Sequence, residues 1–255
     1  MAVRDQRNLH AMGAPNSGGG GAMLRRLKDS FVRLPRVVQG LIALVAGLYL
    51  LALVMGERGL ALLGQVSLVP AEVLNLELWR LVTYWPFHVA KDPLGMIFDI
   101  VILWSLGSIF AHRWRPNHFL FFFVMGCIGA GGVDLLLYLA LPGIFASPQL
   151  GASGGSFALF VAFYLVFGDQ LVSVFGSQPM KGKWVFVAIA ALQVVFFIAG
   201  VNPAFGIQLG GAATGWLLVT GRWRPRKLKA WMGGRQAARE RQRRAEEKSR
   251  FRVIH

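Results

Sequence analysis

The chain has 255 residues, of which 55% are hydrophobic and only 15% are charged, and its formal net charge is +15. Soluble domains are about one-quarter charged, so this composition excludes an ordinary soluble protein and indicates an all-α polytopic membrane protein. Of the 27 Lys and Arg residues, seven precede residue 37 and thirteen follow residue 221, so the positive charge flanks an apolar region and no nucleic-acid partner is expected.

The chain divides into three predicted parts. Residues 1–37 are polar and basic, lack a convincing cleavage site, and are expected to form a flexible cytoplasmic tail. Crossing a bilayer takes about 20 apolar residues, and six such segments form the predicted membrane domain at 38–221. A basic cytoplasmic tail is expected at 222–255. The six segments cover roughly 38–56, 94–111, 118–141, 152–168, 184–200 and 206–221.

The charges of the connecting loops predict the orientation. Basic residues lie between the second and third spans, at Arg113 and Arg115, and between the fourth and fifth, at Lys181 and Lys183. The loops at 141–151 and 201–205 carry no charge. Because cytoplasmic loops are the basic ones, both termini are predicted to face the cytoplasm. The basic tails and the single cysteine suit a protein of the bacterial inner membrane. The basic tails are expected to attract anionic lipid.

The segment from residue 57 to residue 93 is long, amphipathic and predicted to lie on the outer side. It contains Trp79, Arg80 and His88 among further aromatic and acidic residues. Aromatic side chains mixed with charges suit the headgroup region of a bilayer. The simplest expectation is an interfacial helix that anchors this loop.

A serine flanked by small residues, in Gly151-Ala152-Ser153-Gly154, opens the fourth span. It is either a nucleophile at the outer edge of the membrane or part of a seam where two helices meet. The predicted orientation brings Gln208 of the sixth span, and Gly95 and Asp99 of the second, to a similar depth. Gly154 and Ala158 have the spacing of small residues that lets helices approach closely, and the sixth span repeats it, which predicts packing of spans four and six. The glycines concerned in the sixth span are Gly206, Gly210, Gly211 and Gly215.

These motifs resemble the rhomboid family. The Trp79-Arg80 pair, the Gly151–Gly154 motif and the glycines of the sixth span occur in the family's order, and the resemblance covers about residues 38–221. It implies a six-span intramembrane serine protease fold, with a serine on span four and a histidine on span six. Ser153 matches the nucleophile position, and Gln208 occupies the position of the histidine.

The substitution at Gln208 bears on catalysis because a serine hydroxyl is a weak nucleophile until a base takes its proton. An amide does not titrate and is no base. Loss of the base of a catalytic triad costs about six orders of magnitude in turnover. Among the five histidines only His88 is expected on the outer side, in the first loop.

The second span departs from the family in the same direction. Active rhomboids commonly carry a His-x-x-x-Asn pair there that holds the oxyanion, and the matching positions are Gly95 and Asp99. Glycine offers no side-chain donor, and an ionised aspartate repels an oxyanion, although a protonated Asp99 retains a donor. Asp99 is otherwise expected to be a structural hydrogen-bond hub with Trp79, Arg80 or Gln208, and Asp134 of the third span to pair with a neighbour or reach the interface. Ser156 is expected to be a helix-packing residue.

The sequence therefore predicts a catalytically impaired pseudoprotease that binds transmembrane segments of client proteins. One alternative is an atypical intramembrane serine endopeptidase that uses Ser153 with His88, Asp99 or water as its base. A transporter or channel is a third class, which the span count permits but the few buried charges disfavour. The single Cys127 and the absence of metal-ligand spacing predict no disulfide, metal or cofactor.

Overall fold

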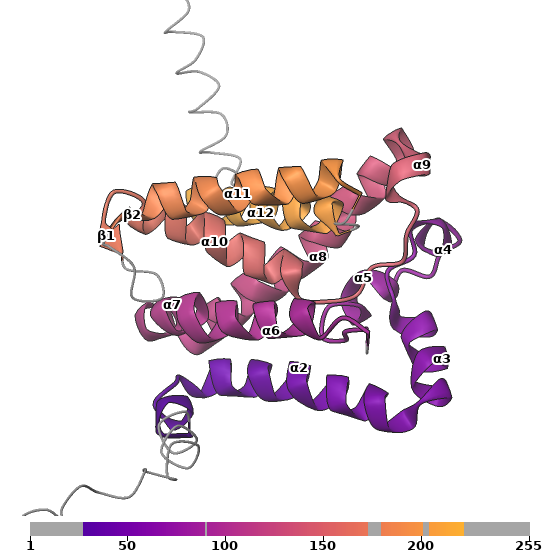
Figure 1. The fold of residues 1–255 in the computed structure, drawn as a ribbon, viewed down its shortest axis with the longest axis horizontal. Helices are drawn as coiled ribbons and strands as arrows, with labels where there is room; N and C mark the ends of the chain where they lie inside the picture. The colour runs from indigo at the N-terminus through magenta and orange to yellow at the C-terminus, as the bar shows by residue number, and fades with distance from the viewer. Residues whose placement is uncertain (1–27, 90, 173–179, 201–203, 222–255) are drawn as a thin grey trace, which may run out of the picture.

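The computed structural model describes residues 28–89, 91–172, 180–200 and 204–221, so the predicted tail at 222–255 and residues 1–27 of the predicted N-terminal tail lie outside the described residues. Helices form most of the described chain, and its one two-stranded sheet is a short hairpin, which confirms the all-α prediction (Figure 1). The elements in order are α2 (Arg36–Met55), α3 (Glu57–Val66), α4 (Pro70–Leu74), α5 (Arg80–Thr83), α6 (Pro93–Ile102), the π-helix η1 (Leu103–Gly107), α7 (Ser108–Arg113), α8 (Pro116–Ala140), α9 (Pro142–Phe145), α10 (Ser153–Phe167), β1 (Leu171–Val172), β2 (Met180–Lys181), α11 (Gly182–Ile198) and α12 (Phe205–Thr220).

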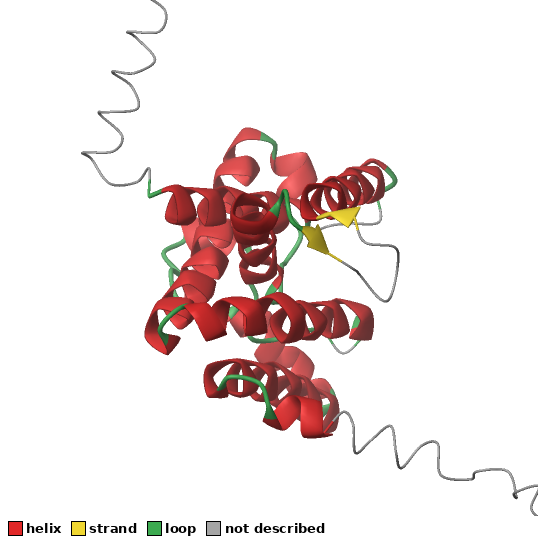
Figure 2. Ribbon diagram, turned by 90° about the vertical axis from the view of Figure 1, so that its left-hand side faces the viewer, coloured by secondary structure: helices red, strands yellow, loops and turns green. Residues whose placement is uncertain are grey.

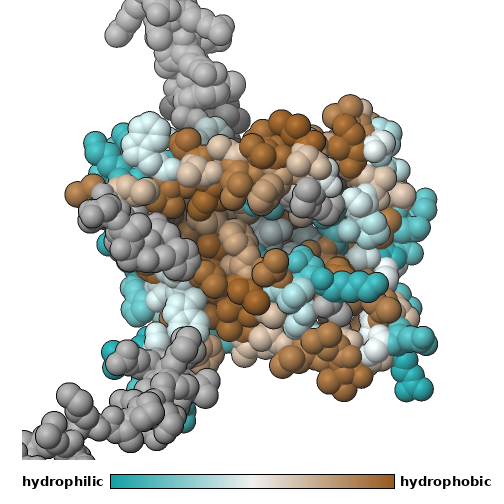
Figure 3. Space-filling view, viewed as in Figure 1, coloured by the Kyte–Doolittle hydropathy of each residue, from teal (hydrophilic) through white to brown (hydrophobic). Residues whose placement is uncertain are grey.

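Each of the six predicted apolar segments is a helix, within about two residues of its expected bounds. Three are long and apolar enough to cross a membrane, namely Arg36–Met55, Pro93–Arg113 and Pro116–Ala140. The helices α10 and α11 are apolar but shorter, with 15 and 17 residues, and α12 has 16. Apolar residues cover much of the face in Figure 3, and hydrophilic residues gather toward its left and right ends.

The core of the bundle is formed by α8, α10 and α12. Glycines allow these three helices to touch through their backbones: a Cβ on Gly215 would lie 2.7 Å from the Cα of Ala158, and one on Gly210 would lie 2.7 Å from the Cα of Ala130. Large apolar side chains such as Phe119, Phe123 and Leu159 fill the space around them. Small residues let helices approach closely. The backbone contacts therefore fix the position of α12 along α8 and α10.

The second membrane segment is one continuous helix with a π-helical turn in its middle. Its first turn is capped by Asp92, whose carboxylate accepts a hydrogen bond from the backbone N–H of Gly95 at 3.0 Å. The π-helix then runs over Leu103–Gly107, and α7 completes the segment. Against this turn packs α2, whose Val38 and Val45 are fully buried.

The segment predicted to be one interfacial helix instead contains the three short helices α3, α4 and α5, at the right-hand end of Figure 1. Leu76, between α4 and α5, has a φ of 74°, a left-handed conformation that ends a helix. Leu60, Leu78 and Trp79 expose much of their apolar surface. The amphipathic character of the segment was therefore predicted correctly, but the prediction of a single helix was wrong.

The helix α11 packs less deeply than its neighbours. Gly182 is its only buried residue among those described, whereas α10 buries most of its length. A hairpin of β1 and β2, which pairs Leu171 with Lys181, joins α10 to α11 and faces the viewer in Figure 2. Lys183 donates a hydrogen bond to Asp169 at 2.9 Å, and this bond lowers the pKa of that exposed carboxyl.

Candidate active site

Ser153 is the first residue of α10 and follows a loop, residues 146–152, that we call the serine loop. Backbone hydrogen bonds in both directions, each 2.9 Å long, tie Gln149 of this loop to Leu68. The backbone N–H of Gly151 donates to the carbonyl of Tyr84 at 3.4 Å. The α3–α5 segment therefore positions the start of α10. The side chain of Ser153 is only partly buried.

Gly151 has a φ of 115°, which favours glycine over any residue with a side chain. A Cβ at this position would also lie 3.3 Å from His88 Nε2 and 3.7 Å from Asp99 Oδ2. The backbone thus passes directly over these two side chains. Gly151 has a conformational role as well as the packing role that the sequence predicted.

Gln208 lies at the start of α12, beside the first turn of α10. Three residues after it, Gly211 contacts Gly154, the neighbour of Ser153, so closely that a Cβ on Gly211 would lie 2.8 Å from the Gly154 Cα. This backbone contact brings Gln208 and Ser153 to one level of the bundle. Gln208 is 9% exposed.

His88, Asp99 and Ser156 form a buried polar cluster at the same level. Asp99 Oδ2 lies 3.0 Å from His88 Nε2, and Asp99 Oδ1 accepts a hydrogen bond from the Ser156 hydroxyl at 2.6 Å. The three residues come from the loop before α6, from α6 and from α10, and are 4%, 2% and 0% exposed. These two partners stabilise the buried carboxylate of Asp99, because leaving it unpaired in the bundle would be costly.

Asp99 is a hydrogen-bond hub, but with other partners than the sequence predicted. Trp79 and Arg80 lie in the α3–α5 segment with partners of their own, and Asp99 instead bonds His88 and Ser156. Ser156, which was expected to be a helix-packing residue, is buried between α10 and α6 and also donates a hydrogen bond. Within the described chain, no hydrogen bond joins the Ser153 hydroxyl to His88 or Asp99.

Asp134 was expected to pair with a neighbour or to reach the interface, and it does neither. It is 1% exposed, and neither of its carboxylate oxygens has a hydrogen-bond partner among the described residues. It lies against Gly206 in the first turn of α12, where any Cβ would collide with the carboxylate. Gly206 thus has its contact with α8, whereas Gly211 and Gly215 contact α10.

Gly95 provides no side chain beside the serine loop. A Cβ there would collide with the Asp92 carboxylate, the group that caps α6 by accepting a hydrogen bond from the Gly95 N–H. The cap therefore favours glycine at this position. Asp92 is a missed residue, although an Asp directly before Pro93 is a typical signal for the start of a helix.

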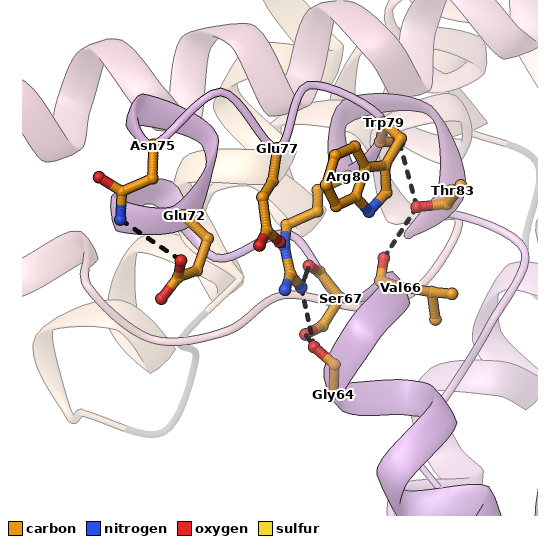
Figure 4. A network of polar contacts seen from close by, with 9 residues as sticks. All are labelled: Gly64, Val66, Ser67, Glu72, Asn75, Glu77, Trp79, Arg80 and Thr83. Atoms are coloured by element: carbon orange, nitrogen blue, oxygen red, sulfur yellow. Dashed lines mark hydrogen bonds and ion pairs between the residues drawn. The ribbon is translucent and has the colours of Figure 1, made fainter.

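Arg80 holds the α3–α5 segment together (Figure 4). Its guanidinium donates to the backbone carbonyls of Gly64 and Ser67, each at 2.8 Å, and pairs with Glu77. Trp79 is 53% exposed, and its carbonyl accepts a hydrogen bond from Thr83 Oγ1 at 3.1 Å. The pair thus combines a buried structural cation with an exposed aromatic ring.

Tyr84 is a positioning residue that the sequence did not single out. Its hydroxyl donates to the carbonyl of Cys127 at 2.6 Å, and burial raises the pKa of the phenol above its ordinary value of 10.0. The group consequently remains a neutral donor and links the serine loop, through the Tyr84 carbonyl, to α8. Its position five residues after Trp79 carried no signal for this contact.

A cavity of about 150 Å³ lies between α10, α11 and α12. Aromatic and aliphatic side chains line it, including Phe157, Phe186 and Ala212. The side chains of Gln193 and Gln208 complete the wall. The cavity is therefore apolar, and Gln208 is one of the residues that line it. In the described ranges, no three metal-ligating side chains gather in one place.

A family model described as the rhomboid domain matches residues 75–225, which include the α5 segment, the serine loop and all of α12. A comparison with curated proteins gives no match. The match covers more than half of the chain and includes Arg80, Ser153 and Gln208. The chain therefore belongs to the rhomboid family, as an integral membrane protein of helical fold.

Proposed function

We propose that this protein is a catalytically impaired rhomboid that binds transmembrane segments of other membrane proteins. The proposal depends on Gln208, which lies at the level of Ser153 and occupies the position that the resemblance assigns to the family's histidine. Its amide has no titratable proton acceptor, so the Ser153 hydroxyl keeps its proton at neutral pH. The scaffold is retained while the acid–base chemistry is lost.

The alternative of an atypical serine endopeptidase requires another base at the Ser153 hydroxyl. His88 and Asp99 are the titratable candidates that the sequence offered. Their hydrogen bonds join them to each other and to Ser156. This arrangement favours the impaired protein over the atypical protease.

Binding of transmembrane segments is supported by the cavity beside Gln208. Its apolar lining suits aliphatic and aromatic side chains, and helices associate in lipid chiefly through close packing and polar contacts. The shallow packing of α11 leaves apolar side chains such as Val195 and Ile198 exposed. In this proposal both termini lie in the cytoplasm of a bacterium, and the basic tails attract anionic lipid.

Proteolysis is tested with the full-length protein in proteoliposomes that also contain a fluorogenic single-span substrate. We expect no cleavage above the level of Ser153→Ala, since both proteins lack a base. Cleavage that Ser153→Ala abolishes would show that the wild-type protein is an active protease. Thermal unfolding of both proteins in detergent serves as the control for folding.

Binding is tested by energy transfer between labelled full-length protein and a labelled synthetic single-span peptide of Leu and Ala in liposomes. Ala212→Phe fills the cavity and is expected to weaken transfer. Ala213→Phe is the matched control, because this exposed neighbour on α12 does not line the cavity. Equal transfer in the wild type and both variants would contradict binding at the cavity.

A further inference from the structure

We propose that the first turn of α12, residues 205–209, opens locally and admits a client segment to the cavity. In this proposal the buried carboxyl group of Asp134 lowers the free-energy cost of opening. The inference rests on the proposed binding of transmembrane segments at the cavity and adds how the occupant enters. Phe205, Gln208 and Leu209 of this turn form part of the cavity wall. Movement of the turn therefore changes the size of the cavity.

The cavity of the closed structure is small for its proposed occupant. Its volume is about 150 Å³, whereas pockets that bind small molecules typically hold at least about 300 Å³. A helix with its side chains is about 10–12 Å in diameter. The side chains of a client helix therefore enter in full only when the wall moves.

The first turn is held less directly than the rest of α12. Further along the helix, a Cβ at Gly211 or Gly215 would meet backbone atoms of α10. The nearest neighbours of a Cβ at Gly206 are instead side-chain atoms, of Asp134 and Phe145. Side chains rotate away more readily than a packed backbone moves. The first turn can therefore separate from α8 while the later glycines hold the remainder of the helix.

The N-terminus of α12 has no capping side chain. Ala204 is the N-cap residue, and its methyl group accepts no hydrogen bond from the N–H groups of the first turn. Alanine is one of the weakest N-cap residues, whereas aspartate is one of the best. At the start of α6, by contrast, Asp92 caps the helix. The first turn of α12 is therefore expected to fray more readily than that of α6.

Asp134 lies against this turn without compensation for its burial. Its side chain is 1% exposed, and neither carboxyl oxygen has a hydrogen-bond partner among the described residues. Opening the turn exposes these oxygens to water, which forms hydrogen bonds with them and so removes a cost of the closed state. The gain exists whether or not the group is ionised, because both forms bond to water. Asp134 therefore shifts the equilibrium toward the open turn.

Apolar contacts hold the turn closed. Phe205 stacks on Phe197 of α11 with ring centroids 4.3 Å apart, and Phe197 stacks on Phe145 of α9 at 6.1 Å. These rings separate without leaving an unpaired polar group. The stack closes the turn and the unpaired carboxyl group opposes closure. Such a balance gives the two-state equilibrium that a bound client can shift.

Asp134→Val tests the role of the carboxyl group, because it removes both oxygens and adds no length to the side chain. Hydrogen exchange of the full-length protein in detergent reports the opening through residues 208–210, whose N–H groups bond to carbonyls at the start of α12. In the wild type these amides should exchange faster than those of residues 212–218. In Asp134→Val they should exchange about 10-fold more slowly, since no unsatisfied polar group then favours the open state.

Client binding is followed by energy transfer to the labelled single-span peptide of Leu and Ala in liposomes. The apparent affinity falls with the population of the binding-competent state, so Asp134→Val should weaken binding by a similar factor. Asp169→Val is the matched control. It removes an exposed carboxylate and should change neither the exchange of residues 208–210 nor the transfer. Should Asp134→Val not yield folded protein, Asp134→Ala removes the same oxygens and carries the same expectation.

Either of two results overturns the inference: exchange of residues 208–210 is unchanged in a folded Asp134 variant, or exchange slows while transfer stays at the wild-type level. Absence of transfer in the wild type would instead overturn the proposed binding of transmembrane segments. The exchange measurement needs no peptide, so it would still decide whether Asp134 favours the open turn. The two failures are therefore distinguishable.

Discussion

Gly211 of α12 and Gly154 of α10 touch through their backbones, with no room for a side chain between them. This one contact sets the level at which Gln208 meets the start of α10. The family resemblance and the geometry therefore depend on the same small residues. The contribution of the Gly211–Gly154 contact to the free energy of unfolding can be measured directly.

Gly211→Ala should destabilise the protein by about 1–3 kcal/mol, because the added methyl group must push two packed helices apart. Thermal unfolding in detergent measures the loss. Gly132→Ala on α8 is the control, since a Cβ at Gly132 meets nothing within 4 Å. Alanine favours a helix over glycine, so the control should be neutral or stabilising; equal losses in both variants would argue against the seam.

Arg80→Ala should destabilise the α3–α5 segment by roughly 2–4 kcal/mol, because it leaves the carbonyls of Gly64 and Ser67 without their charged donor. Hydrogen exchange should rise in residues 64–83 before it rises in the helical core. Arg58→Ala, which changes an exposed arginine of α3, should have little effect. Unchanged exchange in Arg80→Ala would contradict the structural role of the guanidinium.

Ser156→Ala removes one of the two partners of the buried Asp99 and should cost about 1–3 kcal/mol in the free energy of unfolding. Ser105→Ala is the matched control. The Ser105 hydroxyl is exposed and bonds the carbonyl of Val101 in its own helical segment at 2.7 Å, so its loss should be nearly neutral. If both alanine variants melt alike, the bond from Ser156 to Asp99 contributes little.

Asp134→Asn should raise the unfolding temperature, because the carboxylate is buried without a hydrogen-bond partner among the described residues and an amide costs less to bury. The comparison is Asp169→Asn, which removes an exposed ion pair with Lys183 and should change stability little. A lower melting temperature for Asp134→Asn would indicate that the carboxylate has a stabilising partner.

The helices of the membrane domain were predictable because each is a local property of the sequence. Apolar runs and basic loop residues delimit them to within about two positions, and the glycine spacing of α12 indicated a close contact with α10. The partner of each glycine was not predictable. Gly210 contacts Ala130 of α8, and nothing in the spacing of α12 distinguishes its α8 face from its α10 face.

The polar cluster could not be predicted from the sequence, for a different reason. His88, Asp99 and Ser156 are separated by 11 and 57 positions, and only the fold brings them together. From the sequence, His88 was a loop residue, Asp99 was a hub for Trp79, Arg80 or Gln208, and Ser156 was a helix-packing residue. The break at Leu76 was equally hidden, because a left-handed leucine has no signature in composition.

The π-helical turn at Leu103–Gly107 also has a consequence for Asp99. Such a turn accommodates one residue more than an α-helical turn, and one residue corresponds to about 100° of rotation about the helix axis. The angular phase of α6 is therefore offset from that of α7. Deleting one residue from this turn would rotate Asp99 away from α10 and direct its carboxylate toward another side of the bundle.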